Sequence, residues 1–340
     1  MNSIRKNDLL LLALGIVVFA VLQGLISARI IGSFWQLNLL IIGINVIMSV
    51  SLNLINGYTG QFSLGHAGFM AVGAYVGVVL TTNFHAPFLV ALVAGGLAAA
   101  FLGFLIGLPT LRLRGDYLAI ATLGLGEIIR IVIMNIEYVG GAAGFKGIPH
   151  YTTFAWVFFV MLFTLFFIKN FVNSSHGRAC IAIRENEIAA EAMGINLAHH
   201  KRLSFVISSF FAGVAGAMLA MYNSTLSATT FNSAMTYEIL LIVVIGGIGS
   251  ISGSILASFL FIASSEWWLR FLDYESYIGA FKVPLLRGGF RKVVFSVAIM
   301  IIVLFFRRGI MGDKEFSISA LTRRFRRKKV AGSEGGAGNG

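Results

Sequence analysis

The sequence predicts an all-α polytopic membrane protein, a bundle of about ten helix crossings that includes broken or half helices, with both termini in the cytoplasm. Three observations predict this fold class. Apolar residues make up 57% of the 340 residues and charged residues only 12%, whereas soluble domains contain about 25% charged residues. Apolar runs of about 20 residues, the length that crosses a bilayer as a helix, recur along the chain. All four prolines lie at the ends of these runs or between them, where the missing N–H costs least.

The first apolar run, residues 9–27, follows Arg5 and Lys6. It is longer than the roughly 7–15 apolar residues of a signal peptide, so we expect it to remain as the first helix. The later runs cover residues 37–55, 62–80, 87–107, 118–136, 153–170, 204–222, 238–263 and 292–306. Small residues four positions apart, such as Gly73 and Gly77, predict close contacts between helices.

Lys and Arg in short loops predict which side of the membrane each loop faces, because they favour the cytoplasm. With the N-terminus inside, the inner segments of the first six spans hold most of the basic residues, including those of the loop at 171–203. The basic stretch RRFRRKK at 323–329 should also be inside, which requires an even number of crossings after that loop. The run 238–263 must then be split into two half-spans.

Glycine clusters mark the expected helix breaks, because glycine permits a sharp change of backbone direction. The predicted break residues are Gly57, Gly60, Gly246, Gly247 and Gly249. The stretches GYTGQFS (57–63) and GGIGSIS (246–252) share a G-x-x-G-x-x-S spacing. An internal repeat or two independent glycine turns would both explain this spacing. We expect residues 1–312 to form the transmembrane domain and residues 313–340 to form a basic, then Gly-rich, disordered cytoplasmic tail.

The longest hydrophilic stretch between the apolar runs, residues 173–202, contains the signals of a short helix. Asn186 suits the N-cap, Glu187 suits the first turn, and Gly194 suits the position after the last turn. This helix is either a solvated connector or a knob that enters a groove on a partner protein.

Four ordered segments resemble the branched-chain amino acid permeases of ABC transporters. Residues 184–218 resemble the EAA loop and the helix that follows it, and the other three blocks are 57–75, 112–130 and 239–253. The resemblance extends from about residue 45 to 312, and the long basic C-terminus is similar to that of one of the two subunit types of the family.

The resemblance implies a permease subunit in the bacterial inner membrane that carries branched-chain or other hydrophobic amino acids. A permease for urea or short amides is an alternative within the family, and an autonomous channel or ion-coupled carrier is a distant one. The implied partners are two ATP-hydrolysing subunits, a second homologous permease and a periplasmic binding protein. No lysine is followed by Ser or Thr, so a P-loop is missing and ATP and Mg²⁺ would bind the partner subunits. We therefore expect no enzymatic activity, cofactor or metal on this chain.

The resemblance also implies that the loop couples this chain to the ATPases. The residues assigned to coupling are Arg184, Glu185, Asn186, Glu187, Ala189, Ala190, Met193 and Gly194.

Polar residues within the apolar runs are candidates for a translocation path. They are Asn56, Gln61, Ser63, His66, Glu127 and Arg130. Glu127 and Arg130 share a helix face and form either a structural ion pair or part of the path. The other four serve either hydrogen bonding within the bundle or substrate binding at the helix break. Because each basic residue near a membrane gains ~1 kcal/mol from anionic lipid, we expect the tail to contact lipid and not nucleic acid.

Overall fold

The structure, a computed structural model, describes residues 2–113, 115–268, 277–278, 281–282, 293–294, 296–297, 300–301 and 309–312. The chain divides into two compact units. Helix α1 (Asn2–Ser27) belongs to one unit, and the helices from α2 onward belong to the other, which runs from Gly32 to Asp313. The predicted tail at 313–340 lies outside the described residues, as does most of the predicted run at 292–306.

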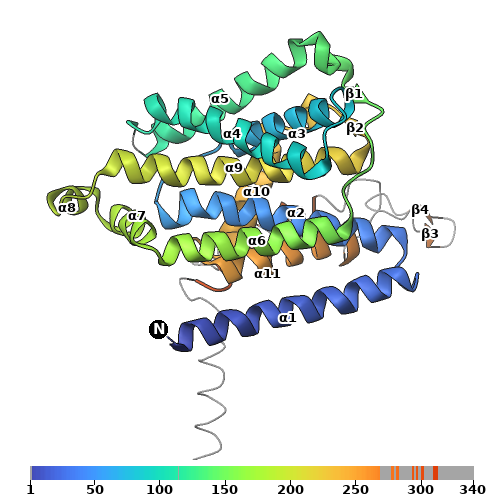
Figure 1. Cartoon of the computed structure of the whole chain (residues 1–340), viewed down its shortest axis with the longest axis horizontal. Helices are drawn as coiled ribbons and strands as arrows, with labels where there is room; N and C mark the ends of the chain where they lie inside the picture. The colour runs from blue at the N-terminus through green and yellow to red at the C-terminus, as the bar shows by residue number, and fades with distance from the viewer. Residues whose placement is uncertain are drawn as a thin grey trace, which may run out of the picture. The chain divides into compact units, whose positions relative to one another are not determined.

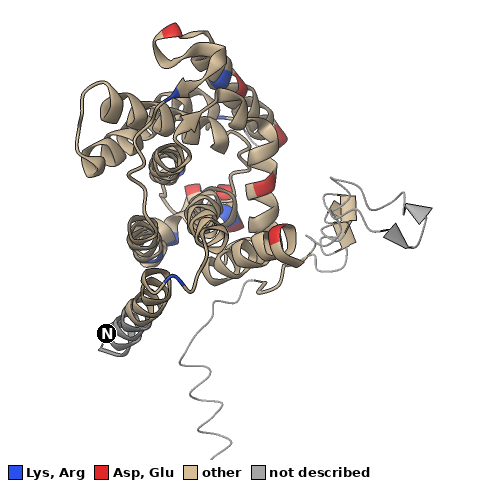
Figure 2. Cartoon of the chain, turned by 90° about the vertical axis from the view of Figure 1, so that its right-hand side faces the viewer, with Lys and Arg blue, Asp and Glu red and all other residues tan. Residues whose placement is uncertain are grey.

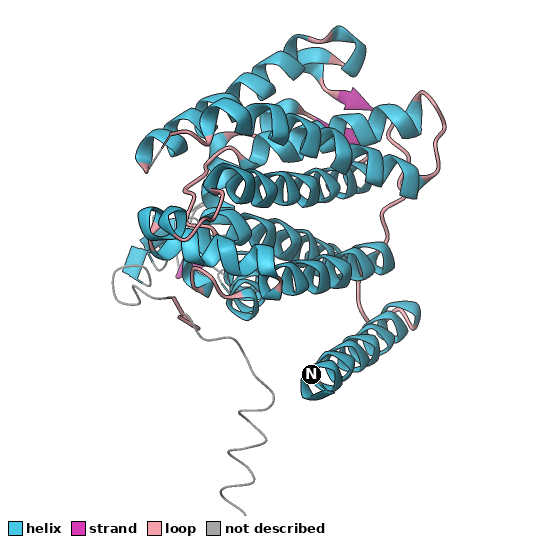
Figure 3. Ribbon diagram, turned by 60° about the vertical axis from the view of Figure 1, so that its left-hand side comes forward, coloured by secondary structure: helices cyan, strands magenta, loops and turns pink. Residues whose placement is uncertain are grey.

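Helices make up most of the second unit (Figure 3). The longer helices are α2 (Ser33–Asn53), α3 (His66–Thr82), α4 (Phe88–Thr110), α5 (Asp116–Asn135), α6 (Phe154–Asn173), α9 (Leu197–Asn223), α10 (Ser233–Gly246) and α11 (Ile251–Ile262). Two short helices, α7 (Ser175–Glu185) and α8 (Glu187–Ala192), lie between α6 and α9. The π-helical turns η1 (Leu54–Tyr58) and η5 (Ala263–Trp268) follow α2 and α11.

The remaining elements are short. The 3-10 turns are η2 (Glu137–Val139), η3 (Gly141–Ala143) and η4 (Ala228–Thr230). Strand β1 (Phe145–Lys146) pairs antiparallel with β2 (Thr225–Leu226), with Phe145 opposite Leu226. Strand β3 (Tyr277–Ile278) pairs in the same way with β4 (Phe281–Lys282).

Five helical segments within the described residues are long and apolar enough to cross a membrane. They are Ser33–Tyr58, Phe88–Thr110, Asp116–Asn135, Phe154–Asn173 and Leu197–Asn223. Most of the described ribbon carries no charged residue (Figure 2). The chain is thus an all-α, multi-pass membrane protein, as predicted, while the number of crossings and the side on which each terminus lies stay predictions.

The second unit has two distinct ends. Helices α7 and α8 lie at one end and strands β1 and β2 at the other, with α2, α6 and α9 running between them (Figure 1). We call these the α7–α8 end and the β1–β2 end. The amide of Ile310 donates to the carbonyl of Ile245 over 2.8 Å, so the turn at 309–312 lies beside the end of α10.

Several observed helix boundaries differ from the apolar runs. The run 238–263 is interrupted as expected, because α10 ends at Gly246 and α11 begins at Ile251. Helix α10 starts earlier than predicted, since the Asn232 side chain accepts a bond from the Met235 amide at 3.1 Å and caps it there. Helix α9 likewise starts at Leu197 because Asn196 caps it. Polar caps extend both helices beyond their apolar residues.

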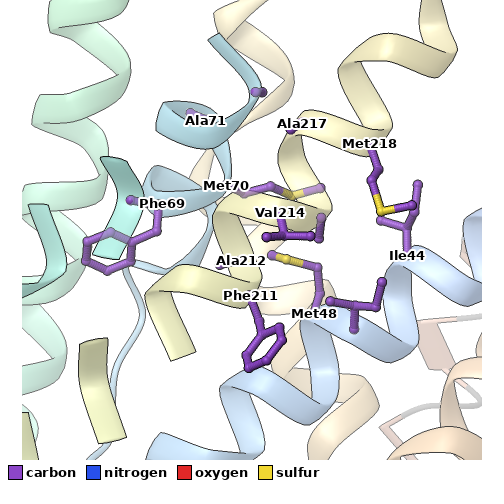
Figure 4. Close-up of a cluster of buried hydrophobic side chains, with 14 of the residues drawn as sticks. Ile44, Met48, Phe69, Met70, Ala71, Phe211, Ala212, Val214, Ala217 and Met218 are labelled. Carbon is purple, nitrogen blue, oxygen red and sulfur yellow. The ribbon is translucent and has the colours of Figure 1, made fainter. Parts of the chain in front are cut away.

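Helix α9 occupies the centre of the core and packs against α2, α3 and α4. The approach of α3 is close: a Cβ on Gly73 would lie 2.1 Å from the carbonyl oxygen of Gly213 in α9, so only glycine fits there. Figure 4 shows Met70 of α3, Val214 of α9 and Met48 of α2 in one cluster of buried side chains. The small residues thus permit the close helix contacts that their spacing predicts.

Candidate functional site

Helix α8 forms where the sequence signals placed it. The Asn186 side chain accepts a hydrogen bond from the Ala189 amide at 3.0 Å and so caps the helix. After the helix, Gly194 has a φ of +83°, and the Ile195 amide returns to the carbonyl of Ala190 over 3.1 Å. These bonds satisfy backbone groups that a short helix otherwise leaves free, so the local sequence explains both ends of α8.

The outer face of α8 carries large apolar side chains. Ile188 and Met193 are 75% and 83% exposed. Ala190 lies on the inner face and is buried, so it supports the helix from within. Of the residues that the sequence assigned to coupling, Met193 therefore faces outward and Ala190 does not. Ile188 was missed, although it lies within the predicted helix.

An ion pair joins α8 to the second turn of α9. The Lys201 ammonium group donates to the Glu187 carboxylate, and Lys201 is buried although it is charged. Burial of a charge is costly unless the charge is paired. The pair thus fixes α8 against α9. The two residues are 14 positions apart, a separation at which no helical spacing rule brings side chains together.

Helix α7 is an element that the sequence analysis did not predict. Its inner face buries Gly177, Cys180 and Ile183, which are spaced three residues apart, and this spacing is the signal that could have revealed it. Ser174 caps its start by accepting from the Gly177 amide at 3.3 Å. Burial raises the pKa of the Cys180 thiol above its usual value. Helix α7 is thus packed on the bundle along one side.

Arg184, near the end of α7, reaches toward the bundle. Its Nη1 donates to the backbone carbonyl of Gly57 over 3.0 Å. Its Nη2 and Nε donate to the neighbouring Glu185 carboxylate over 2.5 and 3.1 Å. One planar guanidinium group therefore binds the loop with two nitrogens and the α2–α3 connection with the third.

The two glycine clusters lie against each other. Asn53 of α2 joins them, because its side-chain amide donates to the Ser250 carbonyl and the Ser254 hydroxyl, each over 3.0 Å. Its oxygen accepts from the Gly249 amide at 2.8 Å. We call residues 57–60 the first glycine turn and residues 246–250 the second glycine turn. Sequence reasoning predicted both breaks but not that one asparagine connects them.

Several of the candidate path residues, which flank the first glycine turn, have buried polar atoms without a hydrogen-bond partner. Within the described residues, hydrogen-bond partners are missing for Asn56 Nδ2, both amide atoms of Gln61, Ser63 Oγ and His66 Nδ1. Gln61 is 3% exposed and Ser63 1%. Buried polar atoms usually bond to protein or ordered water, so this group offers both donors and acceptors to a polar ligand.

These residues lead into the interior of the bundle. The Leu64 amide donates to the Thr122 hydroxyl over 3.0 Å, and the Ala67 amide to the Thr236 hydroxyl over 3.1 Å. Thr122 is six residues into α5, which corresponds to ~9 Å along the helix axis. Helix α3 therefore begins inside the bundle, between α5 and α10.

Glu127 and Arg130 form an ion pair on α5, with 2.7 Å between Arg130 Nε and Glu127 Oε2. The other carboxylate oxygen of Glu127 accepts from the Ser233 amide at 2.9 Å. A carboxylate at the start of a helix is favoured by the helix dipole, so Glu127 holds the start of α10. This geometry supports the structural role that the sequence analysis considered for the pair, and leaves a role in the path open.

Comparison with known proteins identifies related permeases. Residues 37–306 match the family described as branched-chain amino acid transport system / permease component. The chain is 36% identical over 267 residues to the high-affinity branched-chain amino acid transport system permease protein LivM of Escherichia coli K12, an alignment that covers 68% of this chain and 63% of that relative. The chain thus spans less than two thirds of the length of this relative.

More distant relatives carry similar names. The chain is 28% identical over 260 residues to a probable branched-chain amino acid transport permease protein LivM of Methanocaldococcus jannaschii, with 63% of this chain and 75% of the relative covered. It is 23% identical over 330 residues to the permease protein BraD of Pseudomonas aeruginosa, with 88% and 98% covered.

Proposed function

This chain belongs to the branched-chain amino acid transport system permease family, and on that premise we propose that it is a membrane-spanning subunit of an ATP-driven importer. The substrates would be branched-chain or other hydrophobic amino acids, and the site would be the bacterial inner membrane. The names of the relatives support the substrate class.

The observation that carries the proposal is the outer face of α8. Two large apolar side chains, Ile188 and Met193, project from a helix that is fixed from behind by the Glu187–Lys201 pair. Apolar anchors on a rigid support are typical of residues that insert into a groove on a partner. We propose that the α7–α8 end faces the cytoplasm and that α8 inserts into an ATPase subunit.

The proposed complex contains two ATPase subunits, a second homologous permease and a periplasmic binding protein. ATP and Mg²⁺ would bind the ATPases, and this chain would not act as an enzyme. The turn at 309–312 lies beside α10 at the α7–α8 end. This placement supports a cytoplasmic C-terminus and the even number of crossings that the basic tail requires. Anionic lipid would bind that tail.

The proposed path runs along residues 56–66 toward Glu127. The unpaired atoms of Gln61 and Ser63 and the start of α3 inside the bundle support this route, since helix starts and irregular backbone are the groups that bind polar ligands in transporters. The Glu127–Arg130 pair would border the path while it holds α10.

Docking is tested by changing the apolar face of α8. The double substitution I188D/M193D in the full complex should abolish retention of the ATPases on a tagged permease and abolish ATP-dependent amino acid uptake. The control M193L keeps an apolar side chain and should retain both. Full retention of the ATPases by I188D/M193D would disprove docking through α8.

Sidedness is tested with a single cysteine. In a C180A background, M193C places a thiol on the exposed face of α8. A membrane-impermeant maleimide should label it in inverted vesicles and not in intact spheroplasts. Labelling from the outside of spheroplasts would place α8 on the wrong side of the membrane for an ATPase.

A further inference from the structure

We propose that Arg184 is a positioning residue that transmits movement of α8 to both glycine turns of the bundle. This inference rests on the proposed function, because it assumes that α8 receives the movement from an ATPase. It goes beyond the sequence-based assignment, which places Arg184 among the coupling residues without saying what its side chain binds. In the structure, Nη1 of its guanidinium group donates to the Gly57 carbonyl of the bundle.

The contacts of Arg184 bridge two parts of the chain that are 127 residues apart. Nη1 binds the Gly57 carbonyl, which belongs to the connection between α2 and α3, while Nη2 and Nε bind Glu185 of its own loop. A guanidinium group donates from several fixed directions at once, and a lysine ammonium group cannot reproduce this planar geometry. Arg184 is therefore suited to hold both parts in one orientation.

The same side chain also lies against both glycine turns at equivalent positions. Gly60 and Gly249 occupy the same place in the shared G-x-x-G-x-x-S spacing, and both have positive φ, +72° and +89°. A Cβ on Gly60 would lie 2.9 Å from Arg184 Cγ, and one on Gly249 would lie 3.0 Å from Arg184 Nη1. Arg184 thus packs against the matching residue of each turn.

The two turns are joined so that they would move together. Asn53, the last residue of α2, makes two hydrogen bonds to the second glycine turn and a third to Ser254 of α11. The Ile310 amide binds the carbonyl of Ile245, which ties the turn at 309–312 to the end of α10. A displacement of Arg184 would therefore reach the ends of α2 and α10 and the start of α11.

Helix α7 supplies the connection from α8 to Arg184. Only Asn186 separates the two helices, and its amide still donates to the Ala182 carbonyl of α7 over 3.1 Å. Asn186 also caps α8. Because one residue terminates α7 and starts α8, a rotation of α8 acts directly on the end of α7, where Arg184 lies.

The test uses the full complex in proteoliposomes with R184M, which keeps an unbranched apolar stem and removes the donors. We expect normal assembly, a normal melting temperature and continued ATP hydrolysis. The number of amino acid molecules transported per ATP should fall at least about tenfold, the factor that corresponds to loss of one hydrogen bond to a charged group. R184K should give an intermediate ratio, because it keeps the charge but not the planar donors.

The matched control is R178M on the same helix. Among the described residues, the Arg178 side chain binds the Asn173 carbonyl and the Ser175 hydroxyl near the start of α7, so its loss should leave transport per ATP unchanged. R184Q is the second variant and should also lower the ratio, since its shorter amide cannot reach both partners.

Each outcome separates this inference from the proposed function. An unchanged ratio in R184M overturns the role of Arg184 while docking through α8 stands. Loss of ATPase binding in R184M identifies a docking residue and also overturns the inference. If neither R184M nor R184Q assembles, Arg184 is structural and the inference is wrong. Failure of the proposed function appears separately, as unimpaired ATPase binding in I188D/M193D.

Discussion

The α3–α9 interface is held together in a different way from the α7–α8 end. At the interface, helices approach until Gly73 meets the backbone of Gly213, and the surrounding side chains are fully buried. At the α7–α8 end, short helices and glycine turns are joined by single polar contacts such as Arg184 to Gly57. A net hydrogen bond contributes about 1 kcal/mol, or about 1.5–3 kcal/mol where one group is charged, so these contacts can be remade without unfolding the bundle.

The difference indicates which part can move during transport. Close packing transmits strain and resists small displacements, so α3, α4 and α9 form a rigid scaffold. The glycine turns and Arg184 form a region where a change of a few hydrogen bonds alters the positions of helix ends. Each of the following predictions changes one of these two regions.

The largest effect is expected at the rigid interface. Gly73→Leu would force a side chain against the Gly213 carbonyl, where a Cβ alone has only 2.1 Å. We expect loss of stability of about 3 kcal/mol or more, because overpacking moves backbone. Thermal unfolding in detergent measures it. The control Gly124→Leu, on the exposed face of α5 where nothing lies within 4 Å of the Cβ position, should change stability by less than about 0.5 kcal/mol. Equal effects of both substitutions would disprove the close approach.

An intermediate effect is expected where α8 is fixed to α9. Lys201→Met removes the ammonium group that pairs with the Glu187 carboxylate. Because about a third of the Glu187 side chain is exposed, solvent reduces the loss below that of a fully buried pair, to about 2 kcal/mol.

The unfolding free energy of Lys201→Met, Glu187→Gln and the double variant measures this coupling in a double-mutant cycle. The double variant should recover part of the loss. Strictly additive effects would show that the pair contributes no interaction energy.

A smaller effect on stability, with a large effect on transport, is expected in the candidate path. Ser63→Ala removes a buried hydroxyl without a partner among the described residues, so stability should stay the same or rise by less than about 1 kcal/mol. Uptake should fall if Ser63 binds substrate. In the matched control Ser209→Ala, the lost hydroxyl donates to the Phe205 carbonyl at 2.9 Å, and stability should fall by about 1 kcal/mol with uptake unchanged. Normal uptake by Ser63→Ala would remove it from the path.

Local signals predicted local structure well. The N-cap at Asn186 and the glycine at 194 placed α8, and the spacing of Glu127 and Arg130 offered an ion pair as one of two alternatives, because each of these interactions joins residues a few positions apart. The all-α membrane fold followed in the same way from apolar runs.

The contacts that organise the candidate site were outside the reach of such signals. Arg184 meets Gly57, and Asn53 meets Ser250, over 127 and 197 residues. No spacing rule connects residues this far apart, since the packing of the whole bundle decides which carbonyl a side chain reaches. The sequence therefore predicted the two glycine turns but not which residues touch there.

The smallest effect concerns the side of α7 that packs on the bundle. Cys180 is buried, and burial raises the pKa of its thiol. Since the thiolate is the reactive form and burial also limits access of the reagent, a maleimide should label Cys180 more slowly at pH 7 than it labels M193C in a C180A background. The rate at Cys180 should rise as the pH increases toward the raised pKa. Rapid labelling at pH 7 would mean that α7 separates readily from the bundle, and the inner face of α7 would then belong with the movable contacts and not with the rigid scaffold.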